Sequence, residues 1–292
     1  MKAHLKNFIN VTRLNKPIGF LLLFWPCSWG LSLALYFDGD LNIFLYYLFL
    51  FFCGSVLMRS AGCIINDIVD EETDKKVFRT KNRPIASGLL SKKLAWIYTL
   101  ILCSLAFLIL IQFNFLTICL GIFSMIFVFS YPFVKRYTYW PQLFLGFTFN
   151  WGIIMAWASV TNEISYLPIL LYMGAIFWTL GYDTIYGLQD ISDDEVIGVK
   201  STAIKFKNNL NLFVGSCYLI SSAIILLVMM ILKINYCLVF LIFFMFSLFY
   251  QIKFYDLKKS ESCLKAFKLN NLSGLIVFLG FVLLTVNVDE IR

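Results

Sequence analysis

Charged residues are scarce in this chain of 292 residues, since Asp, Glu, Lys and Arg together make up 14% of it. Soluble domains carry about 25% charged and roughly 45–50% apolar residues. Here 60% of the residues are apolar, and the mean hydropathy is +0.81. The scarcity of charge therefore excludes an ordinary soluble globule, a disordered chain and a nucleic-acid-binding domain. It indicates an all-α integral membrane protein that crosses the bilayer several times.

Histidine is almost absent, because His4 is the single one, and none of the eight cysteines forms a C-x-x-C pair. A histidine-based metal site and a Ser-His-Asp triad are therefore excluded. Most of the cysteines lie in apolar runs, which indicates small buried side chains rather than disulfides or zinc ligands.

Long apolar runs are abundant, and most are close to the 20 residues that a helix needs to cross a bilayer. They predict about nine transmembrane helices, whereas barrel strands would alternate over segments of about ten residues. We expect residues 1–292 to form a single polytopic membrane domain. The expected spans lie near residues 18–36, 41–65, 93–112, 115–133, 140–160, 165–187, 209–232, 235–254 and 271–288.

Positive charge is distributed unevenly about these spans. If successive spans alternate in direction, 22 of the 24 Lys and Arg residues fall on the side of the N-terminus, and Lys233 and Arg292 fall on the other. Basic loops mark the cytoplasmic side of a membrane protein. We therefore expect the N-terminus and the loops 66–92 and 188–208 in the cytoplasm. The net charge of +7 is assigned to topology rather than to nucleic-acid binding.

A first acidic cluster follows the second expected span. On a helix, Asn66, Asp70 and Asp74 lie at i, i+4 and i+8, and Asp67 lies three and seven residues before the last two. Like charges stacked on one face repel one another, so a compensating cation is expected. Mg²⁺ prefers oxygen ligands and is commonly held by one or two carboxylates together with the phosphates of a substrate.

A second acidic cluster ends the sixth expected span. Asp183, Asp190 and Asp194 lie at i, i+7 and i+11, with Tyr186 at i+3. Asp183 falls inside the apolar run, where an ionisable group is costly and indicates function. A pair of solvated acidic helix ends is the alternative. It is disfavoured because the spacing occurs twice on the same side of the membrane, and two opposed faces could hold Mg²⁺ ions and a pyrophosphate.

Basic residues near the acids are candidates for binding phosphate oxygens or a substrate carboxylate, and Arg can do so in a bidentate way. The alternative is charge that only sets topology, which is less favoured for Arg79 and Arg83 because they follow the first acids directly. The candidates are Arg79, Lys81, Arg83, Lys135 and Arg136.

The pattern Asn66-Asp67-x-x-Asp70-x-x-x-Asp74, followed by Arg79-Thr80-x-x-Arg83-Pro84, resembles the first motif of the UbiA superfamily of intramembrane prenyltransferases. The second motif is similar to the branch of that superfamily that acts on 4-hydroxybenzoate in ubiquinone synthesis. It reads Tyr182-Asp183-Thr184-x-Tyr186, then Asp190, then Gly198-x-Lys200-Ser201-Thr202. The resemblance covers nearly the whole chain.

The resemblance implies a UbiA-like fold of nine helices around a central cavity open to lipid. It implies Mg²⁺-dependent transfer of a polyprenyl group from polyprenyl diphosphate to 4-hydroxybenzoate, ortho to the hydroxyl, with release of pyrophosphate. On this interpretation Mg²⁺ is held by Asn66, Asp67, Asp70, Asp74, Asp190 and Asp194. Substrate phosphates or carboxylate are bound by Arg79, Arg83, Lys135 and Arg13, and the catalytic candidates are Asp183, Tyr186, Tyr131 and Arg59.

Two alternatives stay open at this point. Another superfamily member would prenylate haem, chlorin or a menaquinone precursor, and a divalent-cation transporter would line a pathway with the same acids. The high content of Phe, Ile, Asn and Lys hints at an AT-rich bacterial genome, so a bacterial inner membrane is expected. The sequence indicates neither the length of the prenyl chain nor the oligomeric state.

Overall fold

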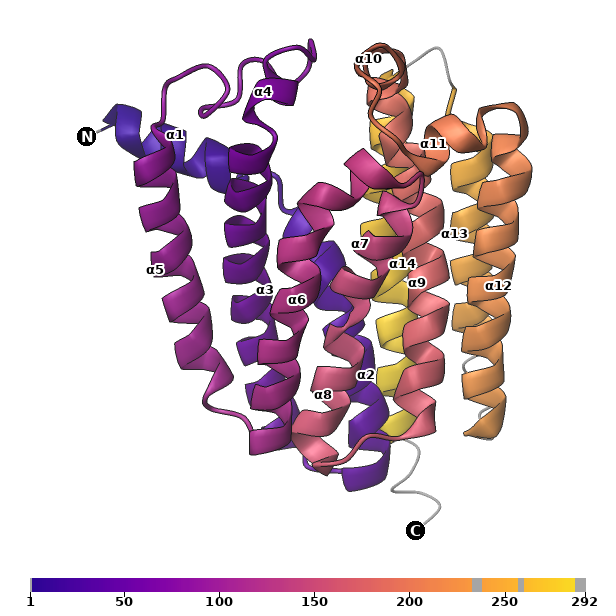
Figure 1. The fold of residues 1–292 in the computed structure, drawn as a ribbon. Coiled ribbons are helices and arrows are strands. Elements are labelled where there is room, and N and C mark those ends of the chain that lie inside the picture. The colour runs from indigo at the N-terminus through magenta and orange to yellow at the C-terminus, as the bar shows by residue number, and fades with distance from the viewer. Residues whose placement is uncertain (1, 233–237, 257–259, 287–292) are drawn as a thin grey trace.

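The structure is a computed structural model that describes residues 2–232, 238–256 and 260–286. These residues form helices and no strands, and most of the long helices run side by side along one direction (Figure 1). The helices are α1 Lys2–Thr12, α2 Ile18–Asp38, α3 Leu41–Val69, α4 Glu71–Asp74, α5 Lys92–Leu110, α6 Phe115–Tyr137, α7 Pro141–Asn150, α8 Gly152–Thr161, α9 Tyr166–Gly187, α10 Ile191–Ile197, α11 Thr202–Lys205, α12 Leu210–Ile231, α13 Leu238–Phe254 and α14 Ser260–Val286, with 3-10 turns at Leu188–Asp190 and Lys207–Asn209.

Seven helical segments in the described part of the chain are long and apolar enough to cross a membrane, and α13 is a shorter apolar helix. The expectation of an all-α multi-pass membrane protein is confirmed. The number of nine spans stays a prediction, as does the single domain 1–292. The seven segments are Ile18–Phe37, Leu41–Val69, Lys92–Leu110, Phe115–Tyr137, Pro141–Thr161, Lys207–Ile231 and Ser260–Leu283.

Helix α9 occupies the centre of the bundle and packs on α7, α12 and α14. Fourteen of its 22 residues are buried, among them Trp178 and Tyr182. The ring of Trp178 lies 5.0 Å from that of Trp29 in α2, and its indole N–H donates to Asn270 of α14 at 2.8 Å. Because α9 faces protein on most sides, it can carry polar residues such as Thr179, Tyr182 and Asp183 along its length.

Helices α3, α5 and α6 lie at the rim, where fewer than a quarter of the side chains in their most apolar stretch are buried. Helix α5 packs mainly on α3. Exposed Leu100, Ile101 and Leu108 on α5 are therefore suited to the hydrocarbon of a bilayer. Helix α1 lies across one end of the bundle and contacts α3 (Figure 1).

Some helices begin, end or divide at places that the expected spans did not indicate. The expected span 140–160 corresponds to the apolar segment Pro141–Thr161, within which the helical hydrogen bonding is interrupted at Trp151 between α7 and α8. Helix α14 begins at Ser260 rather than near 271, since its first turns carry Lys and Asn residues that hide them from a hydropathy search. The expected residues 235–237 and 287–288 lie outside the described residues.

Neither acidic cluster lies on one continuous helix, contrary to the expectation from spacing. Helix α3 ends at Val69, and Asp70 leaves the helical conformation with φ −93° and ψ 5° before the short α4. Helix α9 ends at Gly187, and a 3-10 turn separates it from α10. The i, i+4, i+8 and i, i+7, i+11 faces therefore do not form as expected, although both segments lie at the same end of the molecule (Figure 1).

Candidate active site

The acids of the first cluster form buried ion pairs with arginines from two other segments. Asp67, 1% exposed, accepts from Arg13 at 2.6 Å and from Arg83 at 3.1 Å. The same Arg83 nitrogen lies 2.8 Å from Asp74. Arg13 and Arg83 thus neutralise carboxylates that would otherwise repel one another in a poorly hydrated place.

Asp70 has two carboxylate oxygens in different surroundings. Oδ2 accepts a hydrogen bond from the ammonium of Lys135, at the end of α6. Oδ1 is buried without a hydrogen-bond partner, and the guanidinium of Arg136 lies 4.0 Å from it. Arg136 donates instead to the carbonyl of Val69 at 2.9 Å. A buried, unpartnered carboxylate oxygen is an open coordination position for a cation.

Arg79 joins the loop after the first cluster to the second cluster. Its guanidinium donates to both carboxylate oxygens of Asp190, and the distance from Nε to Oδ1 is 2.6 Å. It also donates to the hydroxyl of Tyr186 at 3.4 Å and lies 5.7 Å from the centre of that ring. The backbone N–H of Phe78 donates to Asp193 at 3.1 Å. Two segments more than 100 residues apart in sequence are therefore tied together above the helices.

Asp194 completes the junction between the clusters. Burial raises the pKa of its carboxyl to about 6, the neighbouring Asp190 adds to the rise, and Lys135 and Arg79 oppose it. Burial likewise raises the pKa of Asp74, while Arg83 lowers it. Because Lys135 pairs with Asp70 and also acts on Asp194, the two acidic clusters lie around a shared set of cations.

The segment after the second cluster is anchored to the bundle by its own polar groups. Gly198 ends α10 with φ 79°, a left-handed conformation that favours glycine. The backbone N–H of Lys200 donates to the carbonyl of Lys135 at 3.1 Å. Thr202 is hydrogen-bonded to two buried residues of the bundle. Its N–H donates to the side chain of Gln142 at 3.0 Å, and its hydroxyl lies 2.7 Å from that of Thr184. This stretch therefore holds Lys135 and α9 in position.

Three further candidates lie deeper, on the helices below the acids. The guanidinium of Arg59 lies 5.2 Å from the ring centre of Phe149, and its Nε is buried without a hydrogen-bond partner. The charge of Arg59 acts on Asp183. Tyr131 interacts electrostatically with both of them and with Asp70. An arginine, a carboxylate and a phenol thus gather between the acids and the core.

The donor set fits a hard divalent cation, although the acids do not converge on one point. Among the described residues, no three acidic, His or Cys side chains lie close enough together to hold a metal as they stand. The negative charge of the acids is compensated instead by four basic side chains, those of Arg13, Arg79, Arg83 and Lys135. The ligand types are carboxylate and amide oxygens, and Asp70 Oδ1 has an unused lone pair, as Mg²⁺ or a similar ion requires.

The structure adds residues that spacing along the sequence did not single out. Asp193 lies off the expected acidic face, yet it receives the N–H of Phe78 and helps to link the loops. Phe149 lies against Arg59 with no sequence signal to distinguish it among 31 phenylalanines. For Asp193, the only signal in the sequence was its position next to Asp194 in the second acidic cluster.

Comparison with known proteins agrees with this geometry. Residues 23–272 match the model of the UbiA prenyltransferase family. A protein of Vibrio atlanticus named 4-hydroxybenzoate octaprenyltransferase is 41% identical over 94% of this chain and 96% of its own length. A rat protein named 4-hydroxybenzoate polyprenyltransferase, mitochondrial, is 39% identical over 96% of this chain and 75% of its own length.

Solved structures share the fold at low identity. The apo structure of a UbiA homolog from Aeropyrum pernix is 19% identical, covers 90% of this chain and 97% of its own, and has a TM-score of 0.74. The structure of a UbiA homolog from Archaeoglobus fulgidus bound to GPP and Mg²⁺ is 14% identical and has a TM-score of 0.67. The match covers 94% of this chain and 99% of the homolog. With its sequence motifs, its helices and these relatives in agreement, the chain belongs to the UbiA prenyltransferase family.

Proposed function

We propose that this protein transfers a polyprenyl group from polyprenyl diphosphate to 4-hydroxybenzoate, as its curated relatives are named to do. The C–O bond of the prenyl diphosphate breaks and pyrophosphate leaves. A C–C bond forms at the ring carbon ortho to the hydroxyl, and that carbon loses its proton. The observation that carries the proposal is the junction of two acidic segments and four basic side chains at one end of the helices.

The acids are proposed to bind Mg²⁺, through Asn66, Asp67, Asp70, Asp74, Asp190 and Asp194 or through water. When bound, Mg²⁺ would neutralise the charge that grows on the leaving pyrophosphate. Oxygen ligands from side chains together with substrate phosphates suit this ion. Homologous structures carry Mg²⁺ or Cd²⁺, which supports a divalent ion in general.

The basic residues are proposed to bind the diphosphate. Arg79, Arg83 and Lys135 are each paired with a carboxylate in the structure. A cation taken up by those carboxylates would free the three side chains for phosphate oxygens. Arginine suits this because its fork can contact two oxygens at once. Arg13 would remain on Asp67 and hold it in position.

The deeper groups are proposed to handle the organic parts of the substrates. The faces of Tyr131 and Tyr186 would stabilise the allylic cation through their π systems. Arg59, with an unused Nε, would pair with the acceptor carboxylate, and Asp183 would orient the phenol or accept the ring proton. Exposed apolar helices around the site keep the prenyl tail in lipid throughout.

The protein is proposed to lie in a bacterial inner membrane with the acidic segments on the cytoplasmic side. The described Lys and Arg side chains of the loops gather at the end that carries the acids, which supports this orientation through the positive-inside rule.

One radiometric assay tests the function. Membranes or purified protein receive labelled 4-hydroxybenzoate, a prenyl diphosphate and Mg²⁺, with EDTA as control. A lipid-soluble prenylated hydroxybenzoate that disappears with EDTA is expected. Product with another aromatic acceptor, but not with 4-hydroxybenzoate, would move the protein to a sister activity. Metal flux in proteoliposomes without any product would point to transport instead.

A further inference from the structure

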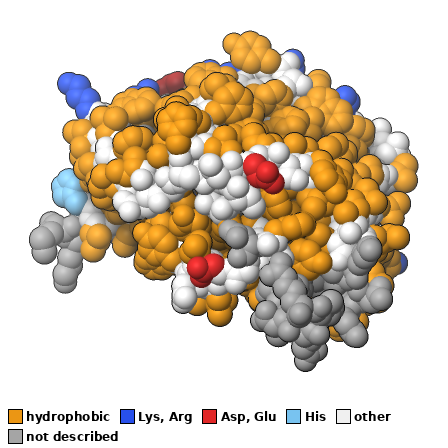
Figure 2. Space-filling model, turned by 90° about the horizontal axis from the view of Figure 1, so that it is seen from below, with side chains coloured by type: hydrophobic (Ala, Val, Ile, Leu, Met, Phe, Trp, Pro, Cys, Tyr) orange, Lys and Arg blue, Asp and Glu red, His pale blue; other side chains and the backbone are white. Residues whose placement is uncertain are grey.

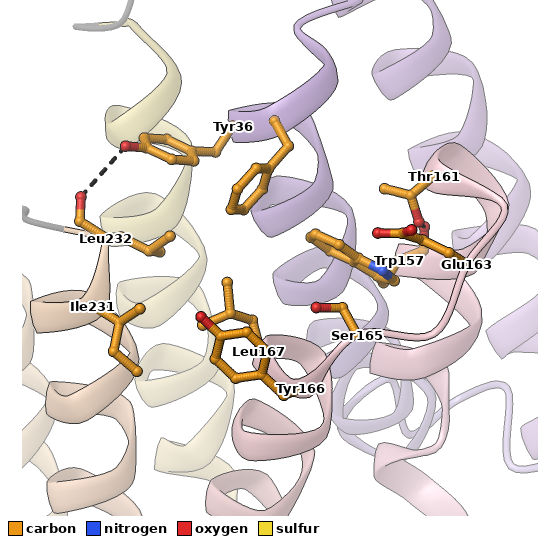
Figure 3. Close-up of a pocket in the computed structure, with 10 residues that line it drawn as sticks. Tyr36, Trp157, Thr161, Glu163, Ser165, Tyr166, Leu167, Ile231 and Leu232 are labelled. Carbon is orange, nitrogen blue, oxygen red and sulfur yellow. Dashed lines mark hydrogen bonds between the residues drawn. The ribbon is translucent and has the colours of Figure 1, made fainter.

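A hollow of about 430 Å³ lies at the end of the bundle opposite the acidic segments. The ends of α2, α8 and α12 and the start of α9 form its walls (Figure 3). Helix α9 runs from this hollow to the active site over 22 residues, about 33 Å. The two sites are therefore separated by roughly the thickness of the hydrocarbon core.

One side of the hollow carries an unused hydrogen-bond donor. Trp157 is 3% exposed, and its indole N–H has no hydrogen-bond partner. Its nitrogen points toward the side of the hollow where Thr161, Glu163 and Ser165 lie (Figure 3). The hydroxyl of Thr161 is already used, since it donates to the carbonyl of Trp157 at 3.1 Å. A buried donor left unpaired is costly, so this position calls for an acceptor.

The charge at this end favours a cationic group in the ligand. Among the described residues, the carboxylates of Asp40 and Glu163 are exposed here, and no Lys or Arg side chain accompanies them. Figure 2, which views the molecule from this end, shows acidic side chains set in a largely apolar surface. Within the described part of the chain Glu163 makes no ion pair or hydrogen bond, whereas Asp40 caps α3 through the N–H groups of Asn42 and Ile43.

The other side of the hollow is aromatic. Tyr36, Phe37 and Tyr166 line it, and the ring of Phe37 meets Trp157 edge-on at 5.4 Å. Tyr36 donates to the carbonyl of Leu232 at 3.3 Å and is thereby fixed (Figure 3). Aromatic faces attract ammonium groups, most strongly where water is excluded. Tyrosine and tryptophan are also the side chains typical of the membrane–water interface.

We propose that this hollow binds the headgroup of a zwitterionic aminophospholipid. The ammonium group pairs with Glu163 between the aromatic rings, and a phosphate or ester oxygen accepts the N–H of Trp157. The acyl chains lie on the exposed apolar side chains beside the hollow, such as Ile231. The proposal concerns the end of the molecule remote from prenyl transfer and does not rest on that function.

Native mass spectrometry of the detergent-purified, delipidated full chain tests the proposal. The probes are phosphatidylethanolamine and phosphatidylglycerol with identical acyl chains. We expect one molecule of phosphatidylethanolamine to bind about tenfold more tightly than phosphatidylglycerol. Equal binding of both lipids would overturn the proposal. So would equally tight binding of glycerophosphoethanolamine, because the ligand would then not be a membrane lipid.

Matched variants locate the binding. Glu163→Gln is expected to weaken the first phosphatidylethanolamine about five- to tenfold and to leave phosphatidylglycerol unchanged, because only the former has an ammonium group. Trp157→Phe is expected to weaken both lipids, because both offer the phosphate and ester oxygens to which the indole N–H would donate. Asp40→Asn removes an acid at the same end and keeps the cap of α3, so it is expected to bind like the parent. Glu163 is exposed, so Glu163→Gln folds even if Trp157→Phe does not. Unchanged lipid preference in Glu163→Gln would overturn the assignment.

Discussion

Asp70 shows what burial does to a single side chain at this site. One oxygen is held by Lys135 and the other has no partner, so the carboxylate is only half compensated. A buried charge without full pairing is destabilising. Function, rather than stability, is therefore the physical reason to keep an aspartate at this place.

Replacement of Asp70 by Asn is expected to reduce prenyl transfer about a hundredfold or more, because it removes a metal-binding charge. Thermal unfolding in detergent should change little, since the half-compensated charge disappears with it. Turnover of the radiolabelled acceptor and a thermal melt measure the two effects. Glu195→Gln is the control, because Glu195 is exposed and pairs with Lys207. Activity at the parent level in Asp70→Asn contradicts the metal assignment.

Arg79 is expected to resist conservative replacement. Arg79→Lys loses the two-pronged contact with Asp190 and the contact with Tyr186, because an ammonium group presents no planar fork. The KM for prenyl diphosphate should rise about tenfold while the KM for 4-hydroxybenzoate changes less. Steady-state kinetics with each substrate varied in turn measures the split. Arg136→Lys is the comparison, and an equal rise in both KM values would argue against a phosphate role.

At the scale of the elements, the site depends on where helices stop. Asp70 leaves the helix between α3 and α4, and the 3-10 turn at Leu188–Asp190 does the same after α9. The loop from Lys75 to Ser91 then crosses to the second cluster and is fastened there by Asp190 and Asp193. At the first interruption Asp70 meets Lys135 at the end of α6, and after the second Asp190 and Asp193 meet the loop that follows α4.

Removal of the Asp193 carboxylate is expected to loosen this junction. Asp193→Ala leaves the N–H of Phe78 without its acceptor, whereas Asp193→Asn can still accept through its amide oxygen. Hydrogen exchange of peptides covering 75–90 should speed up about tenfold in the alanine variant and less than threefold in the asparagine variant. Identical exchange in the parent and Asp193→Ala would show that the contact does not hold the loop.

The contact between α2 and α8 gives a prediction about packing. A methyl group on Gly30 would lie 2.4 Å from the carbonyl oxygen of Ile153 and 2.9 Å from its Cα, so the two backbones would have to separate. Gly30→Ala is expected to cost about 1–3 kcal/mol and lower the melting temperature by several degrees. Gly54→Ala is the matched control, because nothing lies within 4 Å of its added methyl group. An equal effect of the two replacements would contradict this packing.

At the scale of the whole molecule, the charged candidate active site and the aromatic hollow lie at opposite ends of the same helices. The acidic segments and nearly all described basic side chains share one end, and the aromatic hollow lies at the other. Any orientation in the membrane therefore assigns the active site and the hollow to different leaflets.

Labelling with a membrane-impermeant maleimide tests the orientation. Asn82→Cys lies in the exposed loop beside the acids, and Asn42→Cys lies at the opposite end. In bacterial spheroplasts only Asn42→Cys is expected to label, and in inverted vesicles only Asn82→Cys, with the unaltered protein giving the background of its own cysteines. Labelling of both positions from one side would refute the predicted topology.

The sequence is sufficient for the class of fold, because apolar runs of about 20 residues are long enough to cross a bilayer and too long for the strands of a barrel. It also directs attention to Asp67, Asp70 and Asp74, although their roles stay a prediction. Their ion pairs with Arg13, Arg83 and Lys135 were not expected, because the spacing of the acids suggested compensation by a cation alone. Periodicity could not reveal that the helices end at Val69 and Gly187, because the helical spacing of the acids continues past both residues. Hydropathy could not locate the start of α14 either, because polar residues such as Asn270 are buried there. The side chain of Asn270 accepts a hydrogen bond from the indole N–H of Trp178.

The pairing of every first-cluster acid with a basic side chain has a consequence for the order of events. A divalent ion bound by these acids, as proposed, would exchange with internal counter-ions, and the displaced Arg83 and Lys135 would then be available to bind an anion. Metal and diphosphate are therefore expected to bind with positive thermodynamic linkage, each tightening the other by the same factor. Calorimetric titration of Mg²⁺ with and without inorganic pyrophosphate measures that factor. Arg83 and Lys135 would thus serve in turn as counter-ions of the acids and as ligands of the phosphate groups.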